Sequence, residues 1–174
     1  MAGSGTASGI ANSLTKVIQF INQTTERSRQ KRAPMMLYED DVVEAVCEYL
    51  KQSGYRIVSH CTSKQRGIDI VAEHVSSNSL LRVEAKGETS KDSTRKRFGK
   101  PFDNAQVHSH VAGAFFAAAA MLDGTGARVA LAFPDTPLHR RHVSRIGEAI
   151  RRLEIAVFWI DANRGITIES ARPL

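Results

Sequence analysis

Two acidic residues and a lysine on neighbouring predicted strands form the pattern in this sequence that most strongly suggests chemistry. Side chains alternate between the two faces of a strand, so Glu84 and Lys86 share one face of a strand predicted over Leu80–Lys86. Asp69 lies on the preceding predicted strand, Gly67–Glu73, opposite the apolar face of that strand. All three side chains are therefore expected to leave the sheet on a common side.

The segment between these strands predicts how they pair. Residues Val75–Ser79 read VSSNS, which is typical of a turn. A hairpin turn centred between Ser76 and Ser77 places Asp69 directly opposite Glu84, with their side chains roughly 5 Å apart. The register matters, because a slip of one residue moves every side chain of a strand to the other face.

Two adjacent carboxylates repel each other unless a proton or a cation lies between them. A divalent ion that prefers oxygen, Mg²⁺ or Mn²⁺, meets this requirement at Asp69 and Glu84, with the Ala85 carbonyl as a third ligand. Such an ion would polarise a phosphodiester and activate a water molecule for attack on phosphorus. Lys86 would orient that water or stabilise charge on the phosphoryl oxygens.

Two further residues are candidates for the same site. Glu39 lies at the edge of the inward face of a predicted helix and would contact the metal through water, although acidic residues also favour the first turn of any helix. Gln106 would hold the attacking water or a phosphate. Asp103-x-x-Gln106 is also a good capping box, which explains Gln106 without catalysis.

These motifs resemble the PD-(D/E)xK nuclease superfamily, in particular Mrr-type restriction endonucleases and archaeal Holliday-junction resolvases. The resemblance extends over Leu37–Phe133, in element order as well as motif, and Ile68 stands where the name of the superfamily has proline. The matching residues are Tyr38-Glu39, Gly67-Ile68-Asp69, Val83-Glu84-Ala85-Lys86 and Gln106.

The resemblance implies a restriction-endonuclease-like core of order αβββαβ. It implies that Asp69 and Glu84 bind metal, that Lys86 is catalytic, that Glu39 is the helix carboxylate and that Gln106 is accessory. The expected activity is Mg²⁺- or Mn²⁺-dependent hydrolysis of nucleic acid, by a DNA endonuclease rather than an exonuclease, in restriction, repair or recombination. A catalytically inactive nucleic-acid-binding module of the same fold, or a scaffolding protein that binds an acidic partner, are the alternatives.

The charge of the chain agrees with a polyanionic partner. The 174 residues carry a formal net charge of +6. Basic residues gather in the polar segment 87–101 that follows the motif, where they would contact a phosphate backbone or simply be solvated. The candidate nucleic-acid-binding residues are Lys91, Arg95, Lys96, Arg97 and Lys100. A second basic group, on a late helix, is expected to face water or pair with Glu148.

Two cysteines without CxxC spacing make a disulfide framework or a zinc ribbon unexpected. The longest apolar run, Val111–Leu122, is too short for a membrane span. No secretory signal is recognised at the start of the sequence. We therefore expect a cytoplasmic protein.

The order of predicted elements indicates an α/β fold. Residues 1–36 are predicted as an N-terminal helical arm, because apolar residues recur at helical spacing between Ile10 and Ile21. The arm either docks on its own domain or is exchanged with a second subunit, which would give a homodimer. Residues 37–174 form the nuclease-like domain, a mixed sheet flanked by helices. The predicted elements are helices over Leu37–Gln52, 104–122 and 136–153, and strands over Tyr55–His60, Gly67–Glu73, Leu80–Lys86, Arg128–Phe133, Ile155–Ile160 and Ile166–Glu169.

Overall fold

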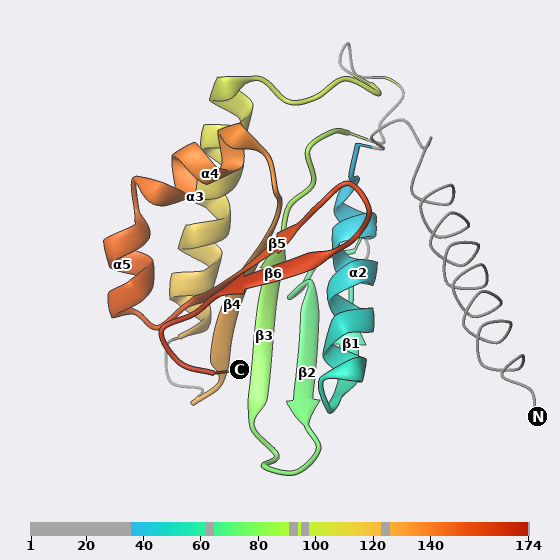
Figure 1. Cartoon of the computed structure of the whole chain (residues 1–174), viewed down its shortest axis with the longest axis vertical. Helices are drawn as coiled ribbons and strands as arrows, with labels where there is room; N and C mark the ends of the chain where they lie inside the picture. Colours follow the sequence, from blue (N-terminus) through green and yellow to red (C-terminus); the bar gives the residue numbers. More distant parts are fainter. Residues whose placement is uncertain (1–35, 62–64, 91–93, 95–97, 123–125, 174) are drawn as a thin grey trace, which may run out of the picture. The chain divides into compact units, whose positions relative to one another are not determined.

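The computed structural model describes residues 36–61, 65–90, 94, 98–122 and 126–173, which belong to one compact unit (Figure 1). The helical arm predicted over residues 1–36, and the homodimer predicted through it, lie outside the described residues except for Met36. Within the part of the chain that is described, no helix is both long and apolar enough to cross a membrane.

A six-stranded mixed sheet forms the centre of the unit, and its strands follow one another in sequence order. The pairs β1–β2, β2–β3 and β5–β6 are antiparallel, whereas β3–β4 and β4–β5 are parallel. The strands are β1 (Tyr55–His60), β2 (Ile70–His74), β3 (Leu80–Ala85), β4 (Arg128–Pro134), β5 (Ala156–Ile160) and β6 (Ile166–Glu169). The predicted α/β class with a mixed sheet is confirmed.

Helices cover both faces of this sheet, as Figure 1 shows. One face packs against α2 (Glu39–Gln52) through a cluster that contains Val83 and Ala85 of β3. The opposite face packs against three helices through a cluster that contains Leu131, Phe133 and Trp159. These helices are α3 (Asn104–Met121), α4 (Pro137–Ser144) and α5 (Gly147–Arg152). Because β4 and β5 lie in the sheet between the two layers of helices, nearly all their residues are buried, as expected for central parallel strands.

The prediction of a single late helix over residues 136–153 is wrong, because the chain forms two helices, α4 and α5, in this segment. Thr136 and Pro137 begin α4 as expected, and the Thr136 hydroxyl accepts a hydrogen bond from a backbone N–H in the first turn. The backbone then leaves helical geometry at Ile146, whose φ and ψ are −114° and 11°. Ile146 is partly buried and packs against the cluster that contains Trp159, and this contact contributes to stabilising the break.

The β2–β3 hairpin has the predicted register. Ile70 pairs with Val83, and extending this register by one residue places Asp69 opposite Glu84. The strand itself begins at Ile70 rather than at the predicted Gly67. Because alternation does not hold before the strand begins, Ile68 packs into the cluster on the α3 face and does not share a face with Ile70.

Candidate active site

The end of the β2–β3 ladder places Asp69 beside Glu84. The Asp69 Oδ2 atom accepts a hydrogen bond from the backbone N–H of Ala85 at 2.7 Å. A side-chain carboxylate thus takes the place of the strand carbonyl that would continue the ladder, which fixes the Asp69 side chain against β3. Glu84 pairs with Leu131 of β4, which is buried beneath α3. Glu84 therefore points to the α3 face of the sheet.

Lys86 brings three carboxylates together. Its Nζ lies 2.6 Å from Glu84 Oε1, 3.8 Å from Glu39 Oε2 and 4.0 Å from Asp69 Oδ2. The ammonium also donates to the Ala85 carbonyl at 2.9 Å. Since the Glu84 and Asp69 oxygens lie at 2.6 and 4.0 Å from one nitrogen, they are at most 6.6 Å apart. The structure thus brings Glu39, Asp69, Glu84 and Lys86 into one acidic cluster.

Gly87 makes the approach of Glu39 feasible. Glu88 ties the chain after β3 to the start of α2, because its N–H donates to the Leu37 carbonyl at 2.9 Å and its Oε1 accepts from the Leu37 N–H at 2.8 Å. A Cβ on Gly87 would lie only 2.5 Å from the Glu39 nitrogen. Only glycine fits this contact without a shift of backbone. The sequence analysis did not identify Gly87 and Glu88. The glycine directly after the ExK motif was the signal that could have revealed this contact.

Burial and like charge set the electrostatics of the acidic cluster. Burial, with the neighbouring carboxylates, raises the pKa of Glu39 despite the opposing effect of Lys86. Burial and Glu84 raise the pKa of Asp69, against the effects of the Ala85 hydrogen bond and of Lys86. Burial disfavours the Lys86 ammonium, but the hydrogen bond and charge of Glu84, with Glu39 and Asp69, outweigh it and raise the pKa of Lys86. A cation is therefore strongly favoured among these carboxylates.

The donors of the acidic cluster fit a hard divalent ion by their chemistry. Glu39, Asp69, Glu84 and the Ala85 carbonyl offer oxygen ligands only, which Mg²⁺ and Mn²⁺ prefer. Among the described residues, no group of three or more acidic, histidine or cysteine side chains is arranged to hold a metal ion. The Lys86 ammonium lies among the three carboxylates. Lys86 thus occupies the position at which the carboxylates attract a cation.

Gln106 is held by the start of α3. Its N–H donates to Asp103 Oδ1 at 2.9 Å, and its Oε1 accepts from the Asp103 N–H at 3.0 Å, so the predicted capping box forms. Among the described residues, Gln106 makes no hydrogen bond to Asp69, Glu84 or Lys86. The structure therefore agrees with the capping interpretation and does not bring Gln106 into the acidic cluster.

His110 of α3 is a neighbour of the acidic cluster that sequence reasoning missed. Burial and the positive charge of Lys86 lower the pKa of its imidazole. The ring packs edge-on against Phe102, with ring centroids 4.4 Å apart. His108 instead meets His142 of α4, with centroids 5.4 Å apart. No sequence signal distinguishes these two histidines, because only the packing of α3 decides which one is affected by the charge of Lys86.

Of the predicted nucleic-acid-binding residues, Lys100 lies in the described part of the chain. Lys91, Arg95, Lys96 and Arg97 lie outside the described residues. Lys100 is exposed, and its carbonyl accepts a hydrogen bond from Thr89 Oγ1 at 2.9 Å. Thr89 is buried three residues after Lys86. Lys100 is therefore anchored next to the segment that leaves the acidic cluster.

Comparison of the chain with protein families, with curated proteins and with solved structures found no match.

Proposed function

We propose that this protein is a Mg²⁺- or Mn²⁺-dependent nuclease of the PD-(D/E)xK type, acting on DNA as an endonuclease. The observation that supports this most strongly is the convergence of three carboxylates within 4.0 Å of the Lys86 ammonium. A protein that only binds a polyanion has no need of clustered acids, which repel phosphate. A bound divalent ion would reverse that repulsion and attract the scissile phosphate.

The order of elements also supports a restriction-endonuclease-like core. The run α2–β1–β2–β3–α3–β4 follows the αβββαβ order, with β3 and β4 parallel and adjacent. The acidic cluster lies where β2 begins and β3 ends, and the first residue of α2 contributes Glu39. Rigid elements thus position each acidic side chain, which favours a catalytic arrangement.

A divalent ion, when bound, would supply polarisation of the phosphodiester and a lower pKa for the attacking water. Asp69, Glu84 and the Ala85 carbonyl would hold this ion, and Glu39 would contribute a further carboxylate. Lys86 leaves Glu84 to stabilise the negative charge that develops on the phosphoryl oxygens. Lys100, which is anchored next to the segment that leaves the acidic cluster, contacts the phosphate backbone.

Cleavage assays on supercoiled plasmid and on single-stranded DNA test this function. The full chain is incubated with Mg²⁺, with Mn²⁺ or with EDTA. We expect cleavage only with the metals, and loss of cleavage in Asp69→Asn and Glu84→Gln. Asparagine at 69 keeps an acceptor for the Ala85 N–H and removes only the charge. Glu73→Gln is the matched control, because Glu73 is a carboxylate of β2 that pairs with Arg56 at the surface.

The same reactions separate the alternatives. A shift of DNA in a native gel without metal-dependent cleavage would replace the nuclease by a DNA-binding module of this fold. If the DNA is neither cleaved nor shifted, the remaining alternative is a scaffolding protein that binds an acidic partner. Equal cleavage by Asp69→Asn and by the unsubstituted chain would show that the activity comes from another site or from a contaminant.

A further inference from the structure

The turn between β5 and β6 holds Arg164 in an unusual backbone conformation. Asp161 Oδ1 accepts hydrogen bonds from the N–H groups of Asn163 and Gly165 at 2.7 and 2.8 Å, which fixes the turn. Arg164 has a φ of 65°, in the left-handed region that residues with a side chain rarely adopt. Glycine would adopt this conformation without strain. The arginine at this position therefore indicates that its side chain has a role of its own.

The Arg164 side chain connects this turn to the first turn of α2. One terminal nitrogen donates to Asp41 Oδ1 at 2.7 Å, and the other donates to Glu44 Oε2 at 3.2 Å. The Asp41 side chain is 15% exposed and that of Glu44 is 63% exposed, so the pair with Asp41 is the better shielded from water. Figure 1 shows the β5–β6 turn beside the start of α2.

Asp41 in turn holds the residue that precedes Glu39. Its other oxygen, Oδ2, accepts a hydrogen bond from the Tyr38 N–H at 2.9 Å, at the N-terminus of α2. Glu39 follows Tyr38 as the first residue of α2, and its Oε2 lies 3.8 Å from Lys86 Nζ. A continuous path of hydrogen bonds and backbone therefore leads from Arg164 through Asp41 to Glu39.

We propose that Arg164 is a positioning residue for Glu39. By holding Asp41, it fixes the start of α2 and keeps the Glu39 carboxylate beside the other carboxylates of the acidic cluster. Within the described residues the ion pairs of Arg164 are with Asp41 and Glu44, so it acts on the acidic cluster through the position of Glu39. This inference rests on the proposed function, in which Glu39 contributes a carboxylate to a divalent ion.

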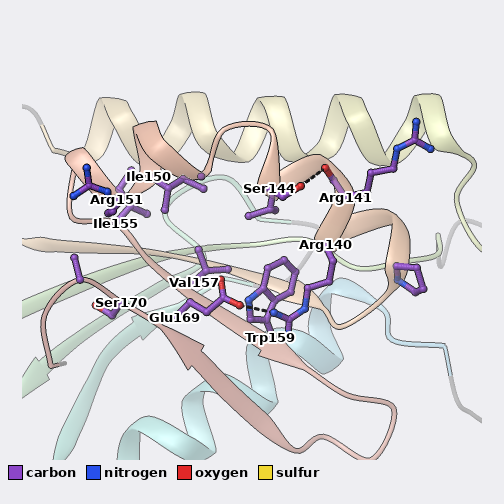
Figure 2. A pocket seen from close by; sticks show the side chains of 14 residues that line it. Arg140, Arg141, Ser144, Ile150, Arg151, Ile155, Val157, Trp159, Glu169 and Ser170 are labelled. Carbon is purple, nitrogen blue, oxygen red and sulfur yellow. Dashed lines mark hydrogen bonds and ion pairs between the residues drawn. The ribbon is translucent and has the colours of Figure 1, made fainter.

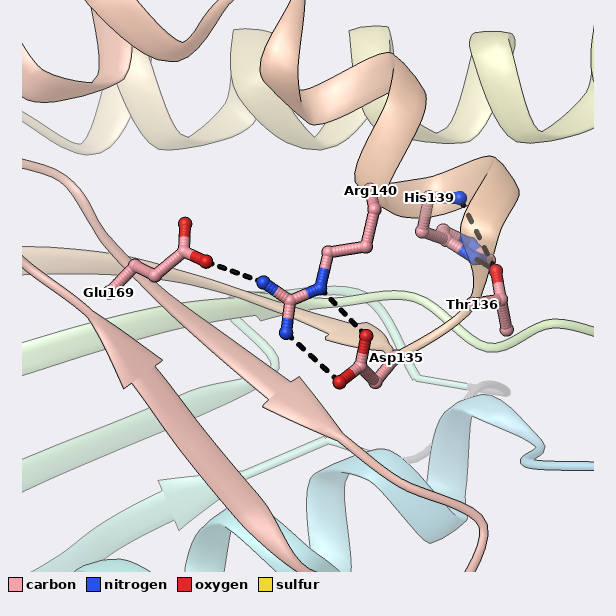
Figure 3. A network of polar contacts seen from close by, with 5 residues as sticks. All are labelled: Asp135, Thr136, His139, Arg140 and Glu169. Atoms are coloured by element: carbon pink, nitrogen blue, oxygen red, sulfur yellow. Dashed lines mark hydrogen bonds and ion pairs between the residues drawn. The ribbon is translucent and has the colours of Figure 1, made fainter.

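Arg140 offers a matched control. Its side chain is 37% exposed, compared with 34% for Arg164, and it also pairs with two carboxylates. Figure 3 shows these contacts, which are with Asp135 and Glu169. Arg140 lines a pocket of about 720 Å³ around Trp159, between α4, α5, β5 and β6 (Figure 2). Among the described residues, none of α2 or of the acidic cluster lines this pocket.

Mn²⁺ binding to the full chain, measured from the electron paramagnetic resonance signal of the free ion, tests the proposal without a cleavage assay. Glu39→Gln should weaken Mn²⁺ binding about tenfold, since it removes a carboxylate from the ion. We expect Arg164→Gly to weaken binding at least about threefold, less than a group that contacts a metal ligand directly. Arg164→Lys keeps a cation for Asp41 and should lose less affinity than Arg164→Gly. Arg140→Gln should bind Mn²⁺ as the unsubstituted chain does.

Two features of these variants separate position from charge and from general damage. Removing the positive charge of Arg164 would by itself strengthen the binding of a cation, so weaker binding reports a displaced carboxylate. Arg164→Gly should also have no further effect when Glu39 is already glutamine, because both substitutions then act through the same side chain. The double variant Glu39→Gln/Arg164→Gly is therefore expected to bind Mn²⁺ as Glu39→Gln does.

Contrary outcomes distinguish this inference from the proposed function. Absence of Mn²⁺ binding by the unsubstituted chain would overturn both. Mn²⁺ binding that depends on Glu39 but is unchanged or stronger in Arg164→Gly would overturn the positioning role alone. The same conclusion follows if Arg140→Gln weakens binding as much as Arg164→Gly, or if the double variant binds more weakly than Glu39→Gln.

Discussion

Replacing Lys86 by methionine tests the acidic cluster without any measurement of activity. The Lys86 and Glu84 side chains are 21% and 13% exposed, so their ion pair at 2.6 Å is largely removed from water. Removing one partner of such a buried pair costs about 3–5 kcal/mol, because the other charge stays buried and unpaired. Here three carboxylates lose their common cation, and methionine keeps the length of the side chain. We expect Lys86→Met to lose about 3 kcal/mol of unfolding free energy.

The assay is urea unfolding at pH 7, with EDTA and then with Mg²⁺. Mg²⁺ should restore more stability to Lys86→Met than it adds to the unsubstituted chain, because the vacated position among the carboxylates then attracts the ion alone. Lys51→Met is the control, since Lys51 is an exposed residue of α2 and should change the unfolding free energy by less than about 0.5 kcal/mol.

Two results would refute this reasoning about Lys86. A loss below about 1 kcal/mol would mean that the carboxylates do not depend on the ammonium. No response of Lys86→Met to Mg²⁺ or Mn²⁺ would mean that the carboxylates do not share a divalent ion, and the nuclease proposal would lose its physical basis.

Three further predictions concern single positions. Asp69→Asn should lower metal-dependent cleavage at least about 100-fold, yet leave the free energy of unfolding at pH 7 equal or higher, because burial and Glu84 disfavour the charge it removes. Gly87→Ala should lower the free energy of unfolding in urea by about 1–3 kcal/mol, since its Cβ would overlap backbone atoms at the start of α2. Gly113→Ala, in open space within a helix, should instead raise the free energy of unfolding by up to about 1 kcal/mol. Burial lowers the pKa of His139 to about 4. The unfolded chain therefore binds this proton first as the pH falls below about 6.5, and stability is lost from there towards pH 4. Between pH 7 and 5 the loss due to His139 is about 2 kcal/mol, and it should be absent from the unfolding curves of His139→Phe.

Each of these predictions has its own contrary outcome. A marked loss of stability in Asp69→Asn would mean that the carboxylate charge, and not only its hydrogen bond to Ala85, holds the end of β3. Equal effects of alanine at Gly87 and Gly113 would contradict the close approach of the loop to α2. An unchanged pH dependence in His139→Phe would mean that folding does not lower the pKa of His139.

The hairpin that carries the proposed site was determined by the sequence. Alternation along β3 and the turn residues after β2 were enough to predict that Asp69 lies opposite Glu84, because the period of a strand is fixed at two and only one register buries both apolar faces. The helix caps at Asp103 and Thr136 could also be predicted from the sequence, since a cap depends only on residues within one helical turn.

Contacts between distant segments were decided only by the tertiary structure. Glu39 lies close to Lys86 because Gly87 allows the segment after β3 to contact the start of α2. A local sequence pattern does not predict this contact between distant segments. The predicted late helix divided at Ile146, whose partly buried side chain packs against the cluster that contains Trp159, and helical periodicity does not specify this contact. The pocket around Trp159 forms where two helices meet two strands, so its shape depends on packing that periodicity does not specify. The sequence thus determined the chemistry that each strand presents, and long-range packing determined which of those groups meet.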